Sequence, residues 1–160
     1  MPSPVSDAAP TDLRELRYAQ HFCVWALRTS VACSPQCRVL LREFDRAFAG
    51  QVDRGLAAWH GLIRSLAGAR RRMLIGRPGH IALAHDERSL LALLAAAQAD
   101  ERERFMAHAR FIMGHDRLDA LYGDAQAFTR LLRDQGHFFS KPRMETLQDA
   151  AFQASLSATG

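Results

Sequence analysis

The most regular hydrophobic pattern in the chain lies between Ser34 and Met73, in the stretch SPQCRVLLREFDRAFAGQVDRGLAAWHGLIRSLAGARRRM. Its apolar positions recur at steps of three and four residues over about ten helical turns. These positions are Cys37, Leu41, Phe44, Phe48, Val52, Gly55, Trp59, Leu62, Leu66 and Met73. Pro35 suits the first turn of a helix, where its missing N–H costs no hydrogen bond. We therefore predict one long amphipathic helix over about 34–73, which its internal glycines could bend.

Helical patterns also fill most of the remaining sequence, and no segment alternates with the period of two that is typical of a strand. The predicted helices span 11–32, 86–113, 116–122 and 124–135, with a last one from Pro142, and a loop covers 75–83. We interpret residues 1–10 as a flexible lead-in and residues 11–160 as one helical domain. The predicted fold class is all-α, an irregular bundle of five to six helices.

Composition limits the class of protein. With 160 residues, 48% of them hydrophobic, the chain can bury one ordinary core. No segment resembles a secretion signal or a membrane span, and three cysteines are an odd number, which fits free thiols in a reducing compartment. We expect a cytoplasmic protein that does not enter a membrane. The long apolar stripe also suggests a homodimer.

Positive charge is concentrated in one part of the chain. No acidic residue occurs between Asp53 and Asp86, whereas six arginines do, and the other 15 basic and 17 acidic residues of the chain give a net −2. The centre of this region is the set Arg70, Arg71, Arg72, Arg77 and His80. Without acidic neighbours, such a surface favours an anionic partner. We expect an acidic protein, with nucleic acid as the alternative.

Soft metal ligands form a second candidate site: His21, Cys23, Cys33 and Cys37. Zinc binds such side chains, but usually from tight turns, whereas Cys23 falls within a predicted helix. We therefore expect core packing for Cys23 and Cys37 and no bound cofactor. A metal- or haem-responsive sensor remains the alternative.

We interpret two further features as packing contacts and not as catalytic or metal-binding groups. Glu101 and His108 share the inward side of a predicted helix, where Glu101 could contact an arginine of the first helix such as Arg17 or Arg28. Phe138 and Phe139 form an aromatic pair that would plug the core or, if exposed, anchor a partner.

No motif for nucleotide binding or for a hydrolase occurs in the chain. The sequence therefore predicts a non-enzymatic binding, regulatory or accessory-subunit protein that uses its basic surface. A sequence-tolerant nucleic-acid binder remains the second alternative.

Overall fold

The structure is a computed structural model that describes residues 9–34, 36–140, 155 and 158. A short 3-10 helix, η1 (Leu13–Glu15), precedes α1 (Tyr18–Ala32), α2 (Arg38–Phe48), α3 (Val52–Ala67), α4 (His85–Gln98), α5 (Arg102–Met113) and α6 (Asp119–Asp134). These described residues contain no strand, and their only sheet-like contact is an isolated antiparallel bridge between Asp12 and Ala82. The predicted all-α bundle of five to six helices is confirmed.

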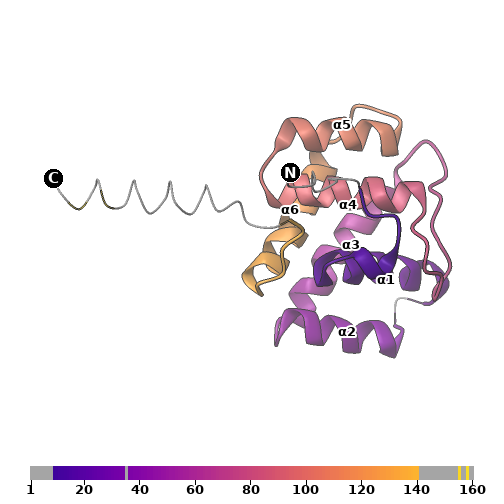
Figure 1. The fold of residues 1–160 in the computed structure, drawn as a ribbon, viewed down its shortest axis with the longest axis vertical. Helices are drawn as coiled ribbons and strands as arrows, with labels where there is room; N and C mark the ends of the chain where they lie inside the picture. The colour runs from indigo at the N-terminus through magenta and orange to yellow at the C-terminus, as the bar shows by residue number, and fades with distance from the viewer. Residues whose placement is uncertain (1–8, 35, 141–154, 156–157, 159–160) are drawn as a thin grey trace, which may run out of the picture.

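The helices form a layered bundle around an aromatic centre. In Figure 1, α5 and α2 lie at opposite ends, with α4, α1 and α3 between them. Rings of Phe44, Phe48, Trp59 and Phe128, from α2, α3 and α6, meet at centroid distances of 5.2 to 6.0 Å. The Trp59 indole donates a hydrogen bond to the Ser30 hydroxyl at 3.0 Å, so its one polar atom is satisfied.

The prediction of one helix over 34–73 is wrong in two respects. The chain turns between α2 and α3, where Ala49 and Gly50 adopt left-handed φ values of 38° and 84°. Glycine takes this conformation without steric cost, so Gly50 supplies the reversal. In addition, α3 ends at Ala67, and residues 68–84 contain no helix. Both helices turn their apolar sides to one shared core, which is why the hydrophobic period continues across the turn.

Two other predicted boundaries also differ from the structure. The helix predicted over 86–113 is two helices, α4 and α5, separated at Asp100, whose φ is 56°. The two short helices predicted over 116–122 and 124–135 are one helix, α6, which contains Gly123 in its second turn. Tertiary packing on α3 and α4 stabilises α6 beyond its local propensity.

Gln98, at the end of α4, fixes the last described loop. Its side-chain amide donates to the carbonyls of Thr129 and His137, and its oxygen accepts from the Phe139 amide at 2.9 Å. Phe139 is consequently buried, while Phe138 is 38% exposed. The predicted helix from Pro142 and residues 1–8 of the predicted lead-in lie outside the described residues.

A membrane-crossing helix would have to be longer and more apolar than any that the structure describes.

Candidate functional site

The connection between α3 and α4, residues 68–84, contains all five residues predicted to bind a partner. We call it the basic loop; it runs along the right-hand side of Figure 1. Loops longer than roughly 12–15 residues are uncommon and are usually either functional or disordered. Arg70, Arg72, Arg77 and His80 are exposed, whereas Arg71 is half-buried.

The first half of the basic loop resembles a β-strand in its exposure pattern. Half-buried side chains alternate with exposed ones along residues 69–75; the backbone bends at Arg70 and Arg71 and then runs without a bend or turn through residues 72–77. The half-buried set is Ala69, Arg71, Met73 and Ile75, and the exposed set is Arg70, Arg72 and Leu74. The alternation places two of the predicted arginines on the outer side of the segment.

Asp86, in the first turn of α4, holds this segment through Arg71. Its carboxylate accepts from both terminal nitrogens of Arg71, at 2.6 and 3.1 Å, and from the Leu74 amide at 2.6 Å. The hydrogen bonds from Arg71, assisted by the Leu74 amide, lower the pKa of Asp86 despite its burial. The Arg71 guanidinium also lies over the Phe111 ring, 5.1 Å from its centroid. The charge of Arg71 is thus compensated inside the protein.

The second half of the loop is held by a buried ion pair between Arg28 of α1 and Glu87 of α4. Two guanidinium nitrogens of Arg28 donate to the two Glu87 oxygens at 2.7 and 2.8 Å, and the side chains are 3% and 0% exposed. Glu87 also accepts from the amides of Gly76 and Ala84, at 3.0 and 2.8 Å. Burial raises the pKa of Glu87, but Arg28 and these amides outweigh it, so the net shift is downward.

Arg28 also binds the loop backbone directly. Its guanidinium donates to the carbonyls of Arg77, His80 and Ala82. The approach is so close at Gly76 that a Cβ there would overlap the guanidinium. A buried charge is costly unless it is paired and fully hydrogen-bonded, and Arg28 meets both conditions. Two ion pairs and the hydrogen bonds of Arg28 therefore anchor both halves of the basic loop.

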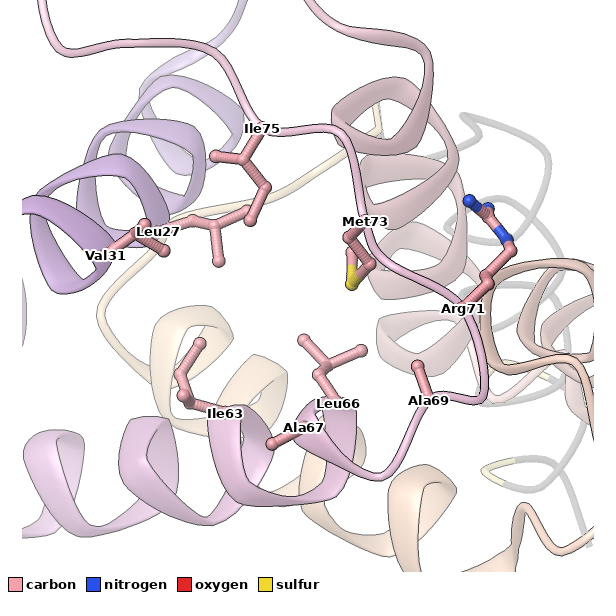
Figure 2. A pocket seen from close by; sticks show the side chains of 9 residues that line it. All are labelled: Leu27, Val31, Ile63, Leu66, Ala67, Ala69, Arg71, Met73 and Ile75. Atoms are coloured by element: carbon pink, nitrogen blue, oxygen red, sulfur yellow. The ribbon is translucent and has the colours of Figure 1, made fainter.

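An apolar groove lies beside the extended half of the loop. It has a volume of about 260 Å³ and is lined by Leu27, Val31, Ile63, Leu66, Ala67, Ala69, Arg71, Met73 and Ile75. Figure 2 shows the aliphatic side chains of α1, α3 and the loop around its opening, with the Arg71 guanidinium directed away from it. The groove volume is below the roughly 300–1,000 Å³ of small-molecule sites. Its size suits aliphatic side chains of a partner.

The exposed arginines of the loop keep their charge available. Within the part of the chain that the structure describes, Arg70, Arg72 and Arg77 form no ion pair. Their acidic neighbours in sequence, Asp86 and Glu87, are occupied by Arg71 and Arg28. The site therefore combines a fixed backbone, uncompensated positive charge and an apolar groove.

Comparisons of the chain with protein-family models, with curated proteins and with solved structures find no match.

The predicted metal ligands lie apart from this site and are not gathered into one group. Cys23 is fully buried in α1, and burial raises its pKa well above the usual value. Cys33 and Cys37 flank the turn between α1 and α2, where their thiols interact. Among the described residues, which include His21, no three His, Cys, Asp or Glu side chains are placed to hold a metal ion.

Cys37 has the more reactive environment of the two turn cysteines. It is the N-cap residue of α2 and forms no capping hydrogen bond of ordinary geometry. The backbone amides of Leu40 and Val39 nevertheless lower its pKa, as expected for a thiolate at a helix N-terminus. Contact with Cys37 raises the pKa of Cys33. Reactivity at this turn should therefore begin at Cys37.

The expected inward position of Glu101 is wrong. Because the chain breaks between α4 and α5, Glu101 is an exposed N-cap residue that pairs with Arg104 at 3.3 Å. Arg28 pairs instead with Glu87, which no feature of the predicted site had included. The signal that could have identified Glu87 is the pair of adjacent carboxylates, Asp86 and Glu87, which ends the acid-free region.

Proposed function

We propose that this chain is a non-enzymatic binding module whose basic loop engages an acidic segment of a partner protein. One observation carries the proposal: a long irregular loop is fixed by two ion pairs and yet presents Arg70, Arg72 and Arg77 without acidic partners. Ordering such a loop in advance reduces the entropic cost of binding. Uncompensated surface charge of one sign also accelerates encounter with an oppositely charged partner.

The apolar groove favours a protein partner over nucleic acid. Phosphate contacts require positive charge but no hydrophobic cavity, and single-stranded nucleic acid is usually held by exposed aromatic side chains. The basic loop contains no Phe, Trp or Tyr, and the exposed ring beside it, Phe111, already has the Arg71 guanidinium over it, whereas Leu74 and Ile81 are 66% and 51% exposed. Apolar anchors beside arginines are typical of protein interfaces.

Affinity capture from the native lysate tests the proposal. The full chain would be compared with a variant in which Arg70, Arg72 and Arg77 are replaced by glutamate. A matched control would reverse Arg38, Arg42 and Arg54, which are also exposed but lie on α2 and at the start of α3. Captures would be repeated at high salt and after nuclease treatment, with mass spectrometry of the bound proteins.

We expect an acidic protein that is captured by the native chain and by the control variant, and that is lost with the loop variant and at high salt. Retention of every captured protein by the loop variant would refute the proposal. Binding that disappears after nuclease treatment would instead assign the loop to nucleic acid.

A further inference from the structure

Residues 73–76 of the basic loop have one backbone edge that is hydrogen-bonded and one edge whose groups have no hydrogen bond to a described residue. On the occupied edge, the amides of Leu74 and Gly76 donate to Asp86 and Glu87. Amides of consecutive residues in an extended backbone point to opposite sides. On the other side, neither the amide nor the carbonyl of Met73 or Ile75 is hydrogen-bonded to any described residue. Such an unpaired edge is a template for another extended chain.

The same two residues line the apolar groove. Met73 and Ile75 line one side of the groove, with Leu27 of α1 beside Ile75 and Ile63 of α3 on the opposite side (Figure 2). An extended chain paired with this edge would direct every second side chain toward the groove. The intervening side chains would lie on the outer face beside Arg72.

We infer that the acidic segment binds as an added β-strand along Met73 and Ile75, with alternate aliphatic side chains in the groove and acidic side chains beside Arg70 and Arg72. The inference rests on the proposed function and specifies its mode of recognition. Main-chain hydrogen bonds supply affinity in this kind of binding, and pockets for alternate side chains supply specificity. The ligand is thus an extended peptide in which acidic and aliphatic residues alternate.

Charge argues against a second copy of the same segment as the occupant. Pairing two copies of residues 69–75 would bring arginines near arginines, and like charges opposite each other destabilise a sheet. An acidic strand reverses the sign of that interaction. The partner therefore differs from the loop that it covers.

A random decapeptide display library, selected on the full chain, provides the probe. We expect the enriched peptides to alternate acidic with aliphatic residues. The best peptide would then be synthesised in two N-methylated forms, one methylated at each alternate set of backbone amides. Because only one set faces the protein, one form should bind about tenfold or more weakly, and the other should bind like the parent.

Amide hydrogen exchange measured by NMR locates the pairing on the protein. In the free chain we expect slow exchange at Leu74 and Gly76, whose amides are bonded, and fast exchange at Met73 and Ile75. With the peptide bound, Met73 and Ile75 should become protected. Unchanged exchange at these two amides, or equal affinity of the two N-methylated forms, overturns the strand-addition inference.

The loop variant with Arg70, Arg72 and Arg77 replaced by glutamate separates this inference from the proposed function. If it loses the selected peptide while Met73 and Ile75 stay unprotected in the native complex, acidic recognition stands and the strand mode is wrong. If no acidic peptide is enriched, or if the variant binds as well as the native chain, both fail.

Discussion

Arg28 belongs to α1, yet most of its hydrogen bonds are made with residues 49 to 59 positions away. In the sequence it belongs to a polar strip with Arg14, Arg17 and His21, and nothing distinguishes it from these neighbours. The role of Arg28 depends on a tertiary contact, so the hydrophobic periodicity of its helix could not reveal that role. The same holds for Glu87, its partner.

Replacing Glu87 with glutamine should destabilise the fold by about 3–5 kcal/mol, because it leaves the buried Arg28 charge uncompensated. Urea unfolding of the native and variant chains measures the difference. Glu103→Gln is the control, since Glu103 is exposed on α5 and its loss should cost less than about 0.5 kcal/mol. A Glu87→Gln chain as stable as the control would show that the ion pair does not hold the loop.

The three cysteines should react with iodoacetamide in a fixed order as the pH rises from 6 to 9. Cys37, whose pKa is lowered by the Leu40 and Val39 amides, should form a thiolate and react first. Cys33, with its pKa raised, should follow, and the buried Cys23 should react only after unfolding. Peptide mapping at timed intervals gives the order. Faster modification of Cys33 than of Cys37 at every pH would contradict the arrangement at this turn.

At the scale of elements, the hydrophobic periodicity of the sequence predicted the helical segments correctly but placed several helix ends at the wrong residues. The apolar steps continue through Val52 because α2 and α3 face one core from either side of the turn at Ala49 and Gly50. The break also changes the phase within α2, where Leu40 is buried and the predicted Leu41 is 39% exposed. The local sequence does not show which glycine reverses the chain, because the position of the reversal depends on how α2 and α3 pack together.

A pair of glycine substitutions tests this account of the breaks. Gly50→Ala should lower the unfolding free energy by about 1 kcal/mol, because alanine resists the left-handed φ of 84°. Gly123→Ala should raise it by up to about 1 kcal/mol, since Gly123 lies inside α6 with open space around it. Thermal unfolding of both variants measures the signs. Stabilisation by Gly50→Ala would imply a continuous helix through that point.

At the scale of the whole molecule, the candidate site was partly predictable. Charge distribution alone identified Arg70, Arg72, Arg77 and His80, which are exposed on one loop. The charge distribution could not show that Arg71 pairs with the buried Asp86, because three consecutive arginines cannot be distinguished from the sequence. The groove and the open backbone edge are products of tertiary packing and have no signature in the sequence.

Acid should destabilise the fold through the two carboxylates that hold the basic loop, Asp86 and Glu87. The folded-state pKa values of Asp86 and Glu87 lie below their usual 3.8 and 4.5. Their stabilising contribution is therefore complete above about pH 4.5 and is lost as the pH falls through the lowered values. Unfolding free energies measured between pH 2 and 7 should fall steeply at the acid end. A Glu87→Gln chain should show a shallower fall, and an identical pH profile would contradict this origin of acid sensitivity.

The charge of the basic loop should select an acidic segment, and a charge-exchange titration measures this selection. The selected peptide and a version with lysine at its acidic positions would each be titrated against the native chain and against the variant with glutamate at Arg70, Arg72 and Arg77. The native chain should bind only the acidic peptide, and the variant should bind only the lysine version. A variant that binds both peptides equally, or neither, would contradict this selection by charge.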